Sequence, residues 1–381
     1  MATYLANRAG SGLDAKQNHV NDVKDLTGRP GALNSLATRL KQEHGDVTLV
    51  VGGPPCQGYS GIGHRRSFTL HKEEIPSNHL YADMAQVVQE VAPKAFVFEN
   101  VRGLLNSRWT RDGEKGEIWR DVQDTFKRIT VKKGRRTLEY EVHAQLVYAK
   151  HYGVPQNRPR ILMVGIRSDI TPTNLSSGVA GGFLPAGDRE APGLQELLGD
   201  LVDPAWAPGG KTTVYPSKPL TEVQEESRTD REGRVISPKG APLTEQEYSN
   251  HNEDVMAKFA YMIANDGEIP EAMRTKKFAQ RVFPASWGKG GPSLTATSLP
   301  DDYVHFAQPR TPTVREWARL QTFPDWYQFA GKRTTGGRRR AGDPSIGEWA
   351  RDVPKFTQIG NAVPVRLAHA VGTHLRELLS E

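Results

Sequence analysis

Two short apolar runs with a helical pattern between them organise the N-terminal part of the chain. Residues 47–51 and 95–98 are continuous hydrophobic stretches, typical of strands buried on both faces of a parallel sheet. Between them, residues 81–91 carry apolar side chains at helical spacing, and Pro93 ends that helix. These segments predict a βαβ unit with parallel strands and a right-handed crossover. The carboxyl ends of both strands then lie at one edge of the sheet, where α/β folds bind ligands.

The pattern of apolar runs continues to Asp169 and then changes. Residues 142–149 and 161–166 predict two more strands, joined by a polar connection that contains several arginines. Beyond Asp169, residues 170–215 and 227–243 are rich in Gly, Pro, Ser and Thr and have few apolar runs. Such a composition is typical of a separate, loop-rich lobe.

Helical patterns return near the C-terminus. Residues 313–321 predict a helix with Thr313 as its N-cap and Glu316 three residues later, and residues 364–379 predict a second amphipathic helix. Between them, residues 331–340 form a basic, Gly-rich loop that suits a phosphate contact as well as it suits solvated charge.

We therefore expect an α/β fold: a mostly parallel, Rossmann-like sheet lobe and a second, smaller loop-rich lobe, with a cleft between them. The larger lobe takes the first part of the chain, the smaller lobe follows, and a final segment with the C-terminal helix returns to the larger lobe. The corresponding residues are 1–170, 171–310 and 311–381.

Composition narrows the possible settings. A quarter of the 381 residues are charged, no apolar run approaches membrane-spanning length, and the N-terminus lacks the apolar segment of a signal peptide. The single cysteine, Cys56, cannot form an internal disulfide, which fits a reducing cytoplasm. The histidines show no zinc-ligand spacing, so we predict no metal site. A net charge of +6 is compatible with a nucleic-acid partner.

Chemically reactive side chains follow both predicted strands. The first strand runs into a Gly/Pro-rich turn that carries Cys56, and the second ends at Glu99. A thiol and a carboxylate on neighbouring strand ends suit nucleophilic addition to an electron-poor ring. Taken singly, Cys56 is as readily a small buried hydrophobe, Glu99 a helix-start carboxylate, and Arg158 and Arg160 a solvated turn.

Five motifs in order resemble the DNA cytosine-5 methyltransferase family. The shared sequences are Pro-Pro-Cys-Gln, Glu-Asn-Val, Gln-Asn-Arg-Pro-Arg, a segment that contains Arg-Glu-Trp-Ala-Arg-Leu-Gln-Thr-Phe-Pro, and Gln-Ile-Gly-Asn-Ala-Val-Pro. They lie at residues 54–57, 99–101, 156–160, 310–324 and 358–364. The resemblance covers residues 20–105, 140–170 and 290–375.

The resemblance implies a mechanism and its catalytic residues. The Cys56 thiolate adds to C6 of a cytosine flipped out of the duplex, and Glu99 delivers a proton to ring N3. Arg160 is then expected to contact the ring, and Arg158 to support the nucleophile loop. By the same resemblance, Gln57, Ser60 and Gln156 are candidates for contact with DNA.

S-adenosylmethionine is the methyl donor that the resemblance implies. Residues 19–23 (His-Val-Asn-Asp-Val) resemble a further motif of the family, in which an Asp contacts the adenine amine. The candidate cofactor contacts are Asp22, Val23, Pro55, Leu80, Asn361 and Ala362. The family opens with a strand, a Gly-rich loop and an acidic residue, which we do not find here. Gly10-Ser11-Gly12 is a weak substitute because no apolar strand precedes it. We therefore expect a sheet that lacks its N-terminal part.

Three interpretations of the missing Gly-rich half remain open. A second polypeptide supplies it, the chain is a truncated form of a longer protein, or the chain is a remnant that binds DNA without methylating it. The favoured function is methylation of C5 of cytosine in a specific double-stranded DNA sequence, in the manner of a prokaryotic restriction-modification enzyme associated with the nucleoid. The alternatives are a catalytically inactive DNA-binding subunit and an RNA cytosine-5 methyltransferase. The long variable region favours duplex DNA, because reading a duplex needs an element that reaches the major groove.

Overall fold

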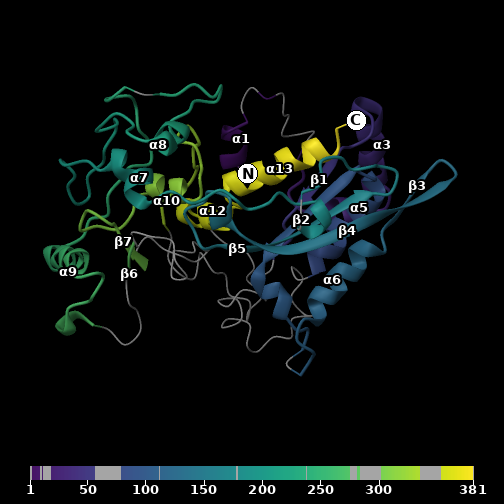
Figure 1. Ribbon diagram of the computed structural model, residues 1–381, viewed down its shortest axis with the longest axis horizontal. Helices are drawn as coiled ribbons and strands as arrows, with labels where there is room; N and C mark the ends of the chain where they lie inside the picture. Colours follow the sequence, from purple (N-terminus) through teal and green to yellow (C-terminus); the bar gives the residue numbers. More distant parts are fainter. Residues whose placement is uncertain are drawn as a thin grey trace.

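The computed structural model describes most of the chain, and Figure 1 shows its arrangement. The described residues are 2–8, 11, 19–55, 79–110, 112–176, 179–236, 238–274, 281–283, 302–334 and 353–380. A strand-and-helix layer lies on the right in Figure 1, an irregular region with short helices lies on the left, and helix α13 runs between them.

Five of the described strands form one sheet in the order β1-β2-β5-β4-β3. Their bounds are β1 (Leu49–Gly52), β2 (Ala95–Val101), β3 (Thr130–Lys133), β4 (Arg136–Tyr148) and β5 (Pro159–Arg167). The predicted strands are therefore present. A separate two-stranded pair joins β6 (Arg281–Val282) to β7 (Tyr303–Val304).

The sheet is mixed, so the expectation of a mostly parallel sheet is wrong for these strands. Only β1 and β2 are parallel, as the βαβ pattern predicts, whereas β2–β5, β5–β4 and β4–β3 are all antiparallel. The reason is the short connection between β4 and β5. A parallel return needs a crossover of a dozen or more residues, usually with a helix, and residues 149–158 contain only one turn of 3₁₀ helix.

Helices cover both faces of the sheet. Successive residues of β2 alternate: Phe96 and Phe98 face one apolar cluster, and Ala95 and Val97 face another. The first cluster is completed by α5 (Leu80–Val91) and α6 (Glu117–Lys127), and the second by α13 (Val365–Leu378). The predicted helices at 81–91 and 364–379 are thereby confirmed within a residue or two at each end.

The remaining described α-helices range from 4 to 13 residues. Their bounds are α1 (Ala2–Ala6), α2 (Lys24–Thr27), α3 (Ala32–His44), α7 (Leu194–Leu198), α8 (Glu222–Ser227), α9 (Glu253–Ala264), α10 (Val314–Leu320) and α12 (Lys355–Asn361). Helix α10 starts with the predicted capping box, in which Thr313 accepts from the backbone of Glu316 and the Glu316 side chain accepts from Thr313.

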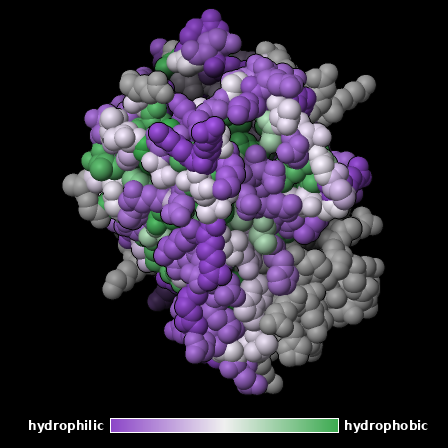
Figure 2. Space-filling view, turned by 90° about the vertical axis from the view of Figure 1, so that its right-hand side faces the viewer, coloured by the Kyte–Doolittle hydropathy of each residue, from purple (hydrophilic) through white to green (hydrophobic). Residues whose placement is uncertain are grey.

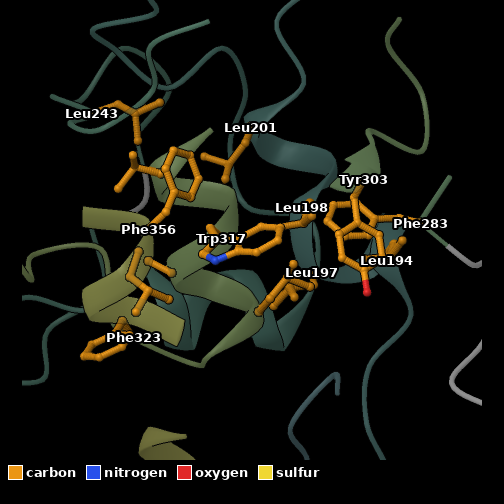
Figure 3. Packing of buried hydrophobic residues seen from close by; sticks show 14 of the residues in the cluster. Leu194, Leu197, Leu198, Leu201, Leu243, Phe283, Tyr303, Trp317, Phe323 and Phe356 are labelled. Atoms are coloured by element: carbon orange, nitrogen blue, oxygen red, sulfur yellow. The ribbon is translucent and has the colours of Figure 1, made fainter. Parts of the chain in front are cut away.

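A further apolar cluster lies in the region on the left of Figure 1. Figure 3 shows Trp317 of α10 at its centre, between leucines of the α7 region and Phe356 of α12. Residues within 194–201, 314–329 and 356–359 thus share one core, which fixes α10 and α12 together. The domain division at 170 and 310 stays a prediction.

Within the described part of the chain, no helix is long and apolar enough to cross a membrane. The same residues hold no group of three or more His, Cys, Asp or Glu side chains placed to bind a metal ion.

Candidate active site

Glu99 and Arg160 form an ion pair at the edge of the sheet where β2 ends and β5 begins. The antiparallel register sets Arg160 opposite Val101, so Glu99 is its diagonal neighbour two residues back. Arg160 Nε lies 2.7 Å from Glu99 Oε1, and both side chains are largely buried. The two residues that the sequence assigned to the cytosine ring are therefore in direct contact.

The turn after β1 lies against the same carboxylate. A side-chain carbon added at Gly53 would stand 3.0 Å from Glu99 Oε2, so glycine allows the turn and the carboxylate to approach closely. The Asn100 side chain donates to the Pro54 carbonyl at 3.2 Å and so fixes the turn to β2. Pro55, the last described residue of this turn, is exposed. The chain thus enters the predicted nucleophile segment directly beside Glu99.

Burial raises the pKa of Glu99 above its ordinary value, and the positive charges of Arg160 and Arg158 oppose that rise. Desolvation is the larger effect, since it disfavours the charged carboxylate more than the two guanidinium groups favour it. A carboxyl group with a raised pKa keeps a larger protonated fraction near neutral pH. Such a group suits a general acid.

The C-terminal turn of α12 is held by side chains from two other segments, an arrangement we call the α12 clasp. Gln321 Nε2 donates to the carbonyls of Ile359 and Ala362 at 2.8 and 2.9 Å. Arg158 Nη2 donates to the carbonyls of Gly360 and Ala362 at 2.7 and 3.1 Å. These donors add partners to carbonyls at the helix end, of which the Ile359 carbonyl also accepts from the Ala362 backbone.

Gln156 supports the clasp from inside the protein. Its side-chain nitrogen donates to the Leu320 carbonyl and to Gln321 Oε1, each at 2.6 Å, and the residue has no exposed surface. A buried amide with these partners orients Gln321, so the structure gives Gln156 a positioning contact. Its contact with DNA stays a prediction.

The cofactor candidates Asp22 and Val23 lie beside α5. Asp22 is exposed, and its Oδ1 accepts from the Lys24 backbone at 3.0 Å, which starts α2 directly after Val23. Helix α2 is tied to α5 by the buried Asp83 carboxylate, which pairs with Lys24 at 2.8 Å. Leu80 is the first residue of α5. Asp22, Val23 and Leu80 therefore belong to one local structure.

The other cofactor candidates lie at the end of α12. Asn361 is the last residue of that helix and is exposed, while Ala362 contributes its carbonyl to the clasp. An exposed carboxylate at Asp22 and an exposed amide at Asn361 are groups that can bind amines and hydroxyls of an adenosine compound. The residues present thus fit the expected cofactor.

Three predicted site residues lie outside the described residues: Cys56, Gln57 and Ser60. Residues 335–340 of the basic loop at 331–340 also lie outside the described residues. So do Gly10 and Gly12 of the Gly10-Ser11-Gly12 segment.

Sequence reasoning missed two residues that shape the site. Asp83 is a carboxylate on the buried face of α5, and a charged residue next to Met84 on an apolar face is a signal for a buried partner. Gln321 falls inside a motif that we recognised, but its partners are 38 residues or more away along the chain, so no local pattern reveals them.

The family model described as C-5 cytosine-specific DNA methylase matches residues 16–377. The Type II methyltransferase M.DdeI of Desulfomicrobium norvegicum is 28% identical over 349 residues, which cover 88% of this chain and 74% of that protein. The Type II methyltransferase M.XorII of Xanthomonas oryzae pv. oryzae is 29% identical over 343 residues, 88% of this chain and 69% of that protein.

A third relative and one solved structure agree. The Type II methyltransferase M.BspRI of Lysinibacillus sphaericus is 28% identical over 350 residues, which cover 90% of this chain but 63% of that protein. The crystal structure of a DNA modification methyltransferase encoded within an E. coli prophage superposes with a TM-score of 0.58 at 20% identity, and covers 91% of this chain and 85% of that one. That likeness supports the α/β methyltransferase fold.

Because the family model spans nearly the whole chain, the chain belongs to the C-5 cytosine-specific DNA methylase family. Its class is that of the DNA cytosine-5 methyltransferases, and members of this family use S-adenosylmethionine.

Proposed function

We propose that this protein transfers a methyl group from S-adenosylmethionine to C5 of cytosine within a specific sequence of double-stranded DNA. The observation that carries the proposal is the ion pair of Glu99 and Arg160 against the Gly53 turn, immediately before Cys56. An acid and a cation converge where the sequence places its only thiol. By similarity to its Type II relatives, the protein acts in a restriction-modification setting.

The reaction starts with addition to the ring. The Cys56 sulfur forms a bond to C6, and the electron pair of the C5–C6 double bond moves through the ring toward N3, which takes a proton from Glu99. The resulting enamine makes C5 nucleophilic. After methylation, loss of the C5 proton and departure of the Cys56 thiolate restore the double bond, and N3 returns its proton to Glu99.

Arg160 has two tasks in this scheme. Its Nε atom holds the Glu99 carboxyl in place, and its positive charge stabilises the negative charge that develops at the ring oxygen O2. Arg158 acts less directly, since its Nη2 donates to the turn of α12. We therefore assign Arg158 a positioning role and keep Arg160 as the ring contact.

S-adenosylmethionine, when bound, supplies an electrophilic methyl group. Asp22, Val23 and Leu80 at the start of α2 and α5 form one side of the proposed cofactor site. Asn361, Ala362 and Pro55 form another. The α12 clasp fixes the backbone on both sides of Asn361, so that its exposed amide is presented in one orientation.

We also propose that a Gly-rich segment completes the cofactor site from beyond β1. Within the described residues β1 lies at the end of the sheet, and Val51 is 66% exposed. An edge strand presents unpaired backbone groups that template pairing with another strand, so a further strand fits this edge. Calorimetry with S-adenosylmethionine tests the idea. Weak binding by residues 1–381, restored by a partner polypeptide or by upstream coding sequence, supports it, and tight stoichiometric binding by this chain alone contradicts it.

Bisulfite sequencing of host DNA, with and without the gene and any neighbouring partner gene, tests the proposed function directly. Gene-dependent 5-methylcytosine in one sequence context supports it. Methyl transfer to duplex DNA and to tRNA, measured side by side, separates the DNA enzyme from an RNA enzyme. DNA binding without methylation under all these conditions would identify a binding subunit instead.

A further inference from the structure

A dense group of cations lies between α6 and β4. Within ten residues the chain carries six basic side chains and no acidic one. All six residues are exposed: Lys127, Arg128, Lys132, Lys133, Arg135 and Arg136. We call this segment the basic hairpin, because its second half is the turn between β3 and β4.

The basic hairpin is rigidly anchored. Val131 pairs with Leu138 across the two strands, and both side chains are buried in the cluster that contains Phe126 and Ile129. The turn is tight, and Gly134 adopts φ 63°, a left-handed conformation that glycine allows. Apolar residues therefore hold one face of the hairpin while the cations point outward from a fixed frame.

Like charges face each other at the tip. Lys133 and Arg136 are directly opposite in the register, a pairing that destabilises a hairpin. Lys133 is compensated by Asp46 and Asp169, at 3.3 and 3.0 Å. Arg128 has Asp124 at 3.6 Å. Three acidic neighbours thus partly offset two of the six cations, and the tip with Arg135 and Arg136 keeps a net positive field.

The basic hairpin is remote from the candidate active site. Arg136 begins β4, whereas Val147 near the other end of that strand pairs with Arg160. Eleven residues of strand separate Arg136 from Val147, which at ~3.3 Å per residue is about 36 Å. The hairpin projects at the right of Figure 1, away from the active-site edge. A duplex that extends fewer than about ten base pairs from Glu99 therefore does not reach this hairpin, because a duplex rises about 3.4 Å per base pair.

We propose that the basic hairpin binds the phosphate backbone of a second segment of duplex DNA, without reading its sequence. Exposed, closely spaced Arg and Lys side chains on a rigid frame match the dense negative charge of a duplex. Figure 2 views the molecule from the side of the hairpin, and the described surface there is largely hydrophilic. That character favours a polyelectrolyte over a protein partner, whose interface needs an apolar centre.

The test uses the full chain and labelled duplex DNA that lacks the target sequence. The protein is first saturated with a short unlabelled duplex containing a target cytosine, and binding of a second, longer duplex is then measured from 50 to 200 mM salt. Arg135→Gln/Arg136→Gln should weaken the second binding about tenfold and reduce the salt slope by about 2, since each lost phosphate contact removes ~0.9. Arg135→Lys/Arg136→Lys should retain most of the affinity.

A matched control removes the same charge elsewhere. Lys41 and Arg376 are exposed on α3 and α13, and Lys41→Gln/Arg376→Gln should change the second binding less than twofold. Equal losses in both double variants, or no loss at the hairpin, would overturn the proposal. So would binding of polyglutamate as tight as that of DNA, which would point to an acidic protein. The readout needs no methyl transfer, so its failure is separate from failure of the proposed function.

Discussion

Arg160 Nε and Glu99 Oε1 are 2.7 Å apart on adjacent antiparallel strands, and this contact couples the two groups that we propose to act on the substrate ring. The guanidinium favours the ionised carboxylate, while burial favours the protonated form and raises the pKa of Glu99. Arg160 therefore limits how far that pKa rises. The proton affinity of the acid and the position of the ring contact cannot be changed independently.

Replacement of Glu99 by Gln should lower turnover by about a hundredfold or more, because the amide cannot deliver a proton. In the wild type, turnover should fall as the pH rises through the pKa of Glu99, since only the protonated form is active. The variant should lose that alkaline fall while binding DNA normally. Single-turnover rates measured across the pH range check this, and an unchanged profile would make Glu99 structural.

Replacement of Cys56 by Ser should abolish methylation and leave DNA affinity within about twofold, because a hydroxyl is far less ionised than a thiol. With the complete cofactor site present, DNA that carries 5-fluorocytosine should trap the wild-type protein covalently, since fluorine cannot leave as a proton does. Denaturing electrophoresis detects the adduct. Substantial methylation by the serine variant would refute the mechanism.

Replacement of Gln321 by Glu should weaken cofactor binding about tenfold, with a smaller effect on DNA binding. The carboxylate cannot donate to the Ile359 and Ala362 carbonyls, so the turn around Asn361 is released. Calorimetry with S-adenosylmethionine, performed on the protein with its complete cofactor site, measures the change.

Gln328→Glu is the matched control for that variant, because Gln328 is exposed and the hydrogen bonds of its backbone, not its side chain, join it to Asn7. It should leave cofactor affinity unchanged. Equal affinities for wild type and Gln321→Glu would show that the α12 clasp does not position Asn361.

The protein should lose stability in acid through His305. Burial lowers the pKa of this imidazole to about 3, and Arg310 adds to the effect. The unfolded chain takes up a proton below about pH 6.5 and the folded protein only near pH 3, so stability is present above pH 6.5 and lost as pH falls through this window. The pKa of the neighbouring Glu316 is lowered from 4.5 to about 2, so this residue also reduces the stability of the fold as the pH falls below 4.5.

His305→Asn should flatten that part of the stability curve. The amide oxygen can accept from the backbone of Ala307 and Gln308, as Nδ1 does, without titrating. Urea unfolding at several pH values between 3 and 7 measures the difference. His369→Asn at an exposed position is the control, and a parallel response of both variants would exclude His305 as the source.

Local patterns predicted the parts of the fold that depend on local sequence. The β1-α5-β2 unit follows from the apolar period and a proline stop, and the family resemblance assigned both Glu99 and Arg160 to the cytosine ring, but no pattern predicted the ion pair between them. The direction of β5 could not be predicted from the apolar pattern of the strand. It depends on the length of the connection from β4, which is too short for a parallel return. The burial of Gln156 was also unreadable, since its partners lie 164 and 165 residues away.

Every acceptor that α12 offers to the clasp is a main-chain carbonyl, of Ile359, Gly360 or Ala362. Main-chain oxygens are present whatever the side chain, so the clasp itself does not select the residue types of this turn, whereas its donors Arg158 and Gln321 have no substitutes of equal reach. A saturation library should therefore show two intolerant donors, with Ile359 and Gly360 restricted by their burial and Asn361 restricted by the cofactor alone.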